Sequence, residues 1–299
     1  MATVTRFSNA HPVVPARGAA PPQPLLSGLE RIVPAGRSRA GRKKSSSVPR
    51  GLGKCLGPAA LIVLWWLSIR YGLVSEDLLP GPATLFATLL EMISSGELAE
   101  ALLLSLQRVV IGFGIGFVTG VGLAIISGLL RLGEDMIDAP MQMARTLPWA
   151  GLVPLLIIWL GIDETPKVTL VAFAVTFPLY INTFAGIRNV DKTLVEAART
   201  LSFGRAALIL EVILPGALPN LLVGLRYSLG SAWLALVFAE TVNAQGGLGY
   251  LITHAREVYR VDIIILCLAI YALLGLGADL VVRLLERFLL SWRQSFDGA

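Results

Sequence analysis

Six apolar runs of about 20 residues constrain the fold of this 299-residue sequence more than any other feature, because that is the length an α-helix needs to cross a bilayer. The composition agrees, since 55% of the residues are hydrophobic and 15% are charged, against about 25% charged in soluble globular chains. The sequence therefore predicts an all-α, polytopic membrane protein. It excludes a cytosolic enzyme, a disordered scaffold and a free nucleic-acid-binding protein. The predicted spans are 55–74, 109–130, 139–162, 168–187, 217–241 and 263–283.

The distribution of Lys and Arg between the predicted loops indicates the orientation, because cationic segments resist translocation. With the N-terminus inside the cell, the cytoplasmic segments hold 18 Lys and Arg, and the outer segments hold 3. We therefore expect both termini to be cytoplasmic.

The first 54 residues are basic and poor in apolar surface. They hold ten of the 25 Lys and Arg, a single acid (Glu30), and much Pro, Ala, Gly and Ser. Such a segment cannot bury enough apolar surface to offset the entropy lost on ordering. We interpret 1–53 as a disordered, topogenic cytoplasmic tail, with contact between the basic cluster 37–50 and anionic lipid as the alternative. Residues 54–292 then form the transmembrane domain, and 293–299 form a short C-terminal tail.

The second predicted span carries a small residue at every fourth position, which lets a neighbouring helix approach its backbone closely. We expect an interior helix in a tight bundle or at a dimer interface. The small residues are Gly112, Gly116, Gly120, Ala124 and Gly128.

The connection 188–218 between spans four and five is far longer than two adjacent antiparallel helices require, which indicates a binding function. Its pattern predicts a helix capped by Thr193, with Glu196 in the capping-box position. A turn follows, and then a second short helix over 206–213 that ends before Pro215. Two short helices at the membrane surface would form a knob suited to a groove on a soluble partner. The apolar face of the first helix consists of Leu194, Ala197, Ala198 and Leu201.

This connection resembles the EAA loop of permease subunits in bacterial ATP-driven importers. That loop reads EAA, three residues, Gly, nine residues, Ile, one residue, Leu-Pro, and the spacing from Glu196 to Pro215 matches it. The chain departs from the pattern at Ser202, where the family has Gly, and at Val212, where it has Ile. Gly204 is an alternative source of the turn. The ATPase-coupling residues that the resemblance implies are Glu196, Ala197, Ala198, Leu201, Ser202, Gly204, Leu214 and Pro215.

The resemblance extends from about Leu78 to Trp292 and is to the nitrate, sulfonate and taurine group of permeases, in particular to the aliphatic sulfonate permeases. The segments that carry it include 79–82, 105–109, 161–164, 177–183 and 247–250. The resemblance implies a type I importer permease fold with its core at about 101–286, in the bacterial inner membrane. It also implies a homodimer, two cytoplasmic ATPase subunits and an outer substrate-binding protein.

No feature of the sequence predicts catalysis, a metal site or a cofactor in this chain. No Gly-x-x-x-x-Gly-Lys-Ser/Thr loop follows a strand, and in the nearest match, 36–43, Arg42 replaces the lysine. The two histidines, His11 and His254, belong to no Cys/His cluster with metal-ligand spacing. We therefore expect a transport subunit that is not an enzyme, with ATP bound by the partner.

Ionisable residues inside the predicted spans are candidates for the translocation path, because burying one in hydrocarbon costs about 2.5–3.5 kcal/mol on insertion scales. For Arg145 and Arg226 a structural role and a substrate contact are both open. Glu240 is interpreted either as part of an outer gate or as a plain interfacial carboxylate. We expect Asp279 to pair with Arg283, four residues later.

The main hypothesis is a permease for aliphatic sulfonates or a related small oxyanion, in contact with membrane lipid and with no nucleic-acid partner. Taurine, nitrate or another small nutrient is the alternative within the same group. The alternative of a different class is a secondary transporter or channel without an ATPase. Such a protein would not need the connection 188–218, and the two halves of the chain show no inverted repeat.

Overall fold

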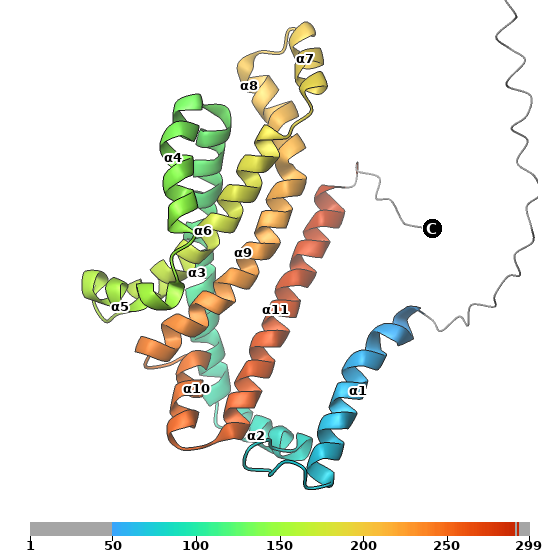
Figure 1. The fold of residues 1–299 in the computed structure, drawn as a ribbon, viewed down its shortest axis with the longest axis vertical. Coiled ribbons are helices and arrows are strands. Elements are labelled where there is room, and N and C mark those ends of the chain that lie inside the picture. The colour runs from blue at the N-terminus through green and yellow to red at the C-terminus, as the bar shows by residue number, and fades with distance from the viewer. Residues whose placement is uncertain (1–49, 291, 293–299) are drawn as a thin grey trace, which may run out of the picture. The chain divides into compact units, whose positions relative to one another are not determined.

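The computed structural model describes residues 50–290 and 292, most of which are helical and none of which forms a β-strand (Figure 1). The chain divides into two units at Pro58, and the bundle described below belongs to the second unit, Ala59–Ala299. Most of the predicted N-terminal tail and the C-terminal tail lie outside the described residues. The helices are α1 (Arg50–Arg70), α2 (Pro82–Ser94), α3 (Glu97–Leu129), α4 (Arg131–Ala144), α5 (Trp149–Leu160), α6 (Thr165–Arg188), α7 (Lys192–Thr200), α8 (Arg205–Ala207), a π-helical segment (Leu208–Ile213), α9 (Leu214–Asn243), α10 (Leu248–Glu257) and α11 (Val261–Leu289).

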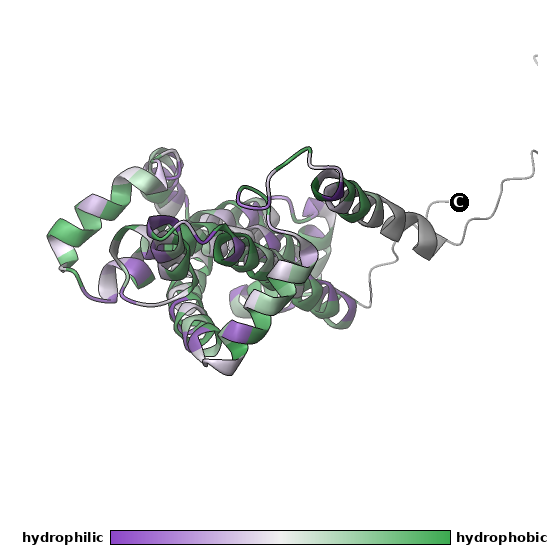
Figure 2. Cartoon of the chain, turned by 90° about the horizontal axis from the view of Figure 1, so that it is seen from below, coloured by the Kyte–Doolittle hydropathy of each residue, from purple (hydrophilic) through white to green (hydrophobic). Residues whose placement is uncertain are grey.

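Four helices among the described residues are long and apolar enough to cross a membrane: α3, α6, the continuous helix Arg205–Val242, and α11. They correspond to predicted spans two, four, five and six. Their outward surfaces are apolar, with Val118 70% and Leu276 67% exposed, as expected for helices that face lipid (Figure 2). The first predicted span overlaps α1, which ends at Arg70 rather than at residue 74 and does not belong to the helices that are long and apolar enough to cross a membrane.

The third predicted span, 139–162, is not one helix. It is broken into α4 and α5, which meet at an angle of 105°. The break follows from Pro148, which caps α5 in an extended conformation and disfavours helical geometry at the residue before it. Pro140 and Pro154 lie inside α4 and α5 and do not end them. If α4 and α5 together count as one span, five segments of the described chain are long and apolar enough to cross a membrane; otherwise four are.

The packed centre of the bundle lies between α3, α6 and α9, where Val171, Val175 and Leu179 are fully buried. The small residues of α3 face α6. A Cβ atom at Gly116 would lie 2.5 Å from the carbonyl oxygen of Ala172, so only glycine fits there. The small-residue stripe therefore forms an α3–α6 contact within one chain.

The second short helix of the connection 188–218 does not end before Pro215, as the sequence had predicted. It runs through the π-helical segment into α9, forming one helix of 38 residues, Arg205–Val242. The Leu214 amide donates to the carbonyl of Ile209, five residues earlier. This widened turn accommodates the ring of Pro215 at the start of α9, so the helix continues.

Candidate functional site

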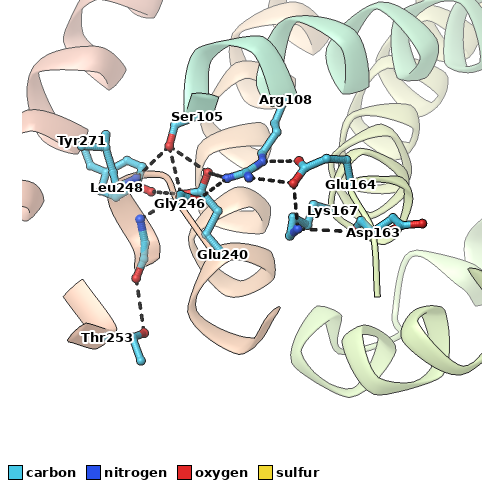
Figure 3. Close-up of polar contacts among 11 residues, drawn as sticks. Ser105, Arg108, Asp163, Glu164, Lys167, Glu240, Gly246, Leu248, Thr253 and Tyr271 are labelled. Atoms are coloured by element: carbon cyan, nitrogen blue, oxygen red, sulfur yellow. Dashed lines mark hydrogen bonds and ion pairs between the residues drawn. The ribbon is translucent and has the colours of Figure 1, made fainter. Parts of the chain in front are cut away.

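A network of charged and polar side chains joins α3, the α5–α6 loop, α9, α10 and α11 at the end of the bundle opposite α7 (Figures 1 and 3). Arg108 of α3 lies at its centre, between Glu240 of α9 and Glu164 of the α5–α6 loop. We call this set the Arg108 network. Its members are Ser105, Arg108, Glu164, Lys167, Glu240, the 246–249 backbone and Tyr271.

Glu240 is the fully buried carboxylate of the Arg108 network, with a side chain that is 0% exposed. It accepts hydrogen bonds from Arg108 Nη1 at 2.6 Å, from Ser105 Oγ at 2.8 Å and from Tyr271 Oη at 3.1 Å. The Gly249 amide donates to it at 2.8 Å. A buried carboxylate with this many donors is fully compensated. Glu240 therefore fixes α9 to α3, α10 and α11, and it is not a plain interfacial group.

Two glycines explain how the chain closes over Glu240. Gly247 has φ of +111°, a conformation that side-chain-bearing residues rarely adopt. A Cβ atom at Gly249 would lie 2.5 Å from the Cβ of Glu240. The Gly247-Leu248-Gly249 stretch therefore lets the start of α10 approach the carboxylate closely enough for a backbone amide to bind it.

The other edge of Arg108 holds Glu164 through two parallel hydrogen bonds. Arg108 Nε donates to Glu164 Oε2 at 2.5 Å, and Nη2 donates to Oε1 at 2.9 Å. Lys167 Nζ donates to the same carboxylate at 2.9 Å and to the Asp163 carbonyl at 3.3 Å. The side chains of Arg108 and Lys167 are each 5% exposed, whereas that of Glu164 is 60% exposed. Two buried cations thus hold one exposed carboxylate.

These contacts set the charge state of Glu164, which lies in the loop before α6. The Arg108 guanidinium, followed by Lys167, lowers the pKa of the Glu164 carboxyl from 4.5 to about 2, although partial burial acts in the opposite direction. Glu164 is therefore ionised at every physiological pH. A pocket of about 560 Å³ opens beside it, and its lining includes Arg108, Lys167, Gln245 and Gly246.

Of the Arg108 network, only Glu240 was predicted from the sequence as a site residue. Arg108 stands immediately before the predicted start of span two at 109, so it counted as a flanking residue, whereas α3 begins eleven residues earlier at Glu97. Lys167 and Glu164 counted as loop charges. The signal that could have found Arg108 and Glu164 was the set of segments 105–109, 161–164 and 247–250, which carry the resemblance and come together in this network.

The two arginines predicted as path candidates lie apart from this network. Arg226 of α9 binds α11, with Nε 3.0 Å from Asp279 Oδ1 and Nη2 2.9 Å from Glu286 Oε2, which gives it a structural role. Asp279 also pairs with Arg283, as predicted. Arg145 caps the C-terminal end of α4 at the break before α5, where it is exposed. Within the described part of the chain Arg145 has no ion-pair partner within 4 Å.

The predicted knob is formed by α7, α8 and the π-helical segment. Glu196, Ala197 and Leu201 are exposed, with Leu201 73% exposed. Ala198 is only 6% exposed, so it packs inside the knob and does not belong to an accessible apolar face, in contrast to the prediction. The first helix is capped by Asp191, which accepts from the Thr193 amide at 2.8 Å, rather than by Thr193 itself.

The turn after α7 is made by Ser202 and not by Gly204. Ser202 has φ of +61°, whereas Gly204 is extended. The Ser202 amide donates to Arg199, and the Phe203 amide donates to Ala198, so the helix ends in a Schellman motif. Ser202 occupies the position of this motif that has a positive φ, which glycine adopts most easily. This preference accounts for the Gly that the EAA pattern has at the same place.

Among residues 50–290 and 292 no group of three or more His, Cys, Asp or Glu side chains is arranged to hold a metal ion.

Comparison with solved structures identifies the fold, and a match to a family model identifies the class of protein. The chain has the fold of type I importer permeases: an amino acid ABC transporter solved with histidines matches with a TM-score of 0.56 at 20% identity, over 66% of this chain and 97% of that one. The MetNI methionine ABC transporter in an inward-facing conformation matches with a TM-score of 0.50 at 16% identity, over 64% of this chain and 96% of that one. Residues 85–291 match the binding-protein-dependent transport system inner membrane components, and the chain belongs to this family.

Several curated relatives cover most of the chain. The putative aliphatic sulfonates transport permease protein of Escherichia coli (strain K12) is 44% identical over 80% of this chain and 91% of its own length. Its counterpart in Bacillus subtilis (strain 168) is 43% identical over 88% of this chain and 94% of its own. The taurine transport system permease protein of E. coli is 32% identical over 78% of this chain and 87% of its own. These relatives are permease subunits, which are not themselves enzymes.

Proposed function

We propose that this chain is the membrane-spanning subunit of an ATP-driven importer for aliphatic sulfonates or a related small oxyanion. The observation that carries the substrate class is the identity of 44% and 43% to two aliphatic sulfonate permeases over most of the chain. The taurine permease, at 32% identity, supports the same chemistry more weakly, because taurine is also a sulfonate.

In this proposal two copies of the chain pair in the inner membrane with their termini in the cytoplasm. Two ATPase subunits bind ATP and dock on the knob, and an outer protein delivers the substrate. The exposed Glu196, Ala197 and Leu201 form the docking surface, while Ala198, Ser202 and Gly204 shape the knob. Leu214 and Pro215 connect the knob to α9.

Among the path candidates, Arg145 is the one we assign to the translocation path. It is exposed at the α4–α5 break and carries the charge that attracts an anion. Arg226 stabilises the α9–α11 contact. Glu240 anchors the Arg108 network, which we assign to the outer gate because the Lys and Arg distribution favours an outer position for that end of the bundle.

Uptake of labelled ethanesulfonate tests the substrate class. Cells that lack their own sulfonate importers are given this chain with its ATPase and binding protein. We expect them to accumulate ethanesulfonate, and accumulation should cease when the ATP-binding lysine of the ATPase is replaced. Import of nitrate without import of ethanesulfonate would contradict the proposed substrate, and uptake that persists with the inactive ATPase would identify a secondary transporter or channel.

Substitutions in the knob test ATPase docking separately. Glu196→Lys and Ala197→Trp change exposed positions, so we expect the permease to insert normally but to lose most co-purifying ATPase and most uptake. Glu257→Lys is the matched control, because Glu257 is an exposed acid at the end of α10, far along the chain from the knob. Wild-type ATPase recovery and uptake in both knob variants would remove the docking role from this surface.

A further inference from the structure

Arg108 and Lys167 together form a site of the shape that an oxyanion requires. Arg108 presents Nε and Nη2 in parallel to the two oxygens of Glu164, and Lys167 Nζ reaches one of those oxygens from a second direction. A bidentate guanidinium with an added ammonium is the usual protein ligand set for carboxylate, phosphate and similar groups. A sulfonate offers the same pair of oxygens, and a third in addition.

The two carboxylates that Arg108 holds differ sharply in their surroundings. Glu240 has no exposed side-chain surface and is bound by three further donor groups, so removing it would leave buried donors unpaired. Glu164 is 60% exposed and lies on the loop before α6, where Arg108 and Lys167 hold it. It can therefore leave Arg108 and Lys167 for water at a much smaller cost in solvation than Glu240 could.

The charges also balance for a monoanion. Arg108 and Lys167 carry two positive charges, and Glu240 and Glu164 carry two negative charges. When Glu164 swings away, one positive charge is left beside a pocket of about 560 Å³ that both cations line. A singly charged anion restores neutrality. Asp163 also lines this pocket, but its carboxylate pairs with neither cation.

We propose that Glu164 occupies a substrate site in the permease itself, and that the anionic headgroup of the substrate displaces it from Arg108 and Lys167 during transport. The substrate class of this inference rests on the proposed function, whereas the displacement rests on the geometry of the Arg108 network. The displaced Glu164 frees the α5–α6 loop from α3, so binding of the anion and release of that loop occur together.

Calorimetric titration of the full permease with its ATPase in lipid nanodiscs tests this site, with ethanesulfonate as the probe. In the wild type Glu164 competes as an intramolecular ligand at high effective concentration, so binding is weak. Glu164→Gln removes the competing charge, and we expect ethanesulfonate to bind about ten-fold more tightly or better. Asp163→Asn is the matched control, because it removes a neighbouring carboxylate that holds neither cation, and we expect a change of less than about three-fold. The uncharged isostere ethanesulfonamide should bind to none of these proteins.

A second substitution shows where the gained affinity resides. Lys167→Gln in the Glu164→Gln background removes one cation but leaves the Arg108–Glu240 pair intact, and we expect the gain to disappear. Equal binding by wild type and Glu164→Gln, or a gain in Asp163→Asn as large as in Glu164→Gln, would overturn the inference. If the inference fails in this way but cells that carry the wild-type chain still take up ethanesulfonate, the proposed function stands. If Glu164→Gln binds ethanesulfonate more tightly but those cells do not take it up, the proposed function is contradicted and the inference about the site is not.

Discussion

At the scale of single residues, Glu240 accepts hydrogen bonds from four groups, Ser105, Arg108, Gly249 and Tyr271, which belong to α3, α10 and α11. Glu240→Gln keeps the shape but removes the charge that compensates Arg108 and leaves a donor facing other donors. Breaking a buried ion pair on one side costs about 3–5 kcal/mol, so we expect a clear fall in the Tm of the purified permease. Glu257→Gln, at an exposed position, is the control and should leave the Tm unchanged. Equal Tm values for the two variants would show that Glu240 does not anchor the helices.

The pH dependence of stability should report the bond between Arg108 and Glu164. The folded-state pKa of Glu164 is depressed from 4.5 to about 2, so its stabilising effect is complete above about pH 5 and is lost as the pH falls toward 2. We expect wild type to have a higher Tm than Glu164→Gln at pH 7, and this difference to shrink by more than half by about pH 3. A Tm difference that stays constant between these pH values would argue against an ionised pair.

The residue scale is also where prediction from the sequence reached its limit. Glu240 could be recognised, because a carboxylate inside an apolar run is conspicuous. Its partner Arg108 could not, since an arginine at the edge of an apolar run looks like an ordinary flanking charge until the start of the helix is known. Ala198 shows the same difficulty, because a periodic apolar face does not reveal whether it meets a partner or the protein's own neighbouring helix.

At the scale of helices, the α3–α6 contact gives a direct test of the small-residue stripe. Gly116→Ala would place a Cβ atom 2.5 Å from the Ala172 carbonyl oxygen, whereas Gly114, two residues earlier, has nothing within 4 Å of that position. We expect Gly116→Ala to destabilise the permease by about 1–3 kcal/mol, as overpacking does, and Gly114→Ala to leave its stability essentially unchanged. Thermal unfolding of the two variants checks this, and equal effects would mean that α3 and α6 are not in such close contact.

The helices themselves were largely predictable, since four of the apolar runs became continuous membrane-length helices. Two of the failures concern proline. Pro148 breaks the third run into α4 and α5, whereas Pro215 leaves a helix of 38 residues intact. Sequence alone did not separate these outcomes, because they depend on whether the preceding turn can widen into a π-helical segment or must become extended.

At the scale of the whole molecule, the orientation in the membrane is open to a labelling test. Ser95, between α2 and α3, and Thr200, at the end of α7, are exposed at opposite ends of the bundle (Figure 1). In a cysteine-free background (Cys55→Ser, Cys267→Ala), we expect an impermeant maleimide to label Ser95→Cys in intact cells and Thr200→Cys only after permeabilisation. The reverse pattern would invert the proposed topology.

The continuous helix Arg205–Val242 connects the two ends of the bundle and can transmit a tilt from one end to the other. Its 38 residues, at 1.5 Å each, span about 57 Å, with the knob at one end and Glu240 two residues from the other. A tilt of about 5° around the middle of such a rod moves each end sideways by about 2.5 Å. That displacement is comparable to the hydrogen-bond lengths of 2.6 and 2.8 Å that hold Glu240 to Arg108 and Ser105 of α3. A few degrees of motion imposed at the knob would therefore suffice to separate α9 from α3 at the other end of the bundle.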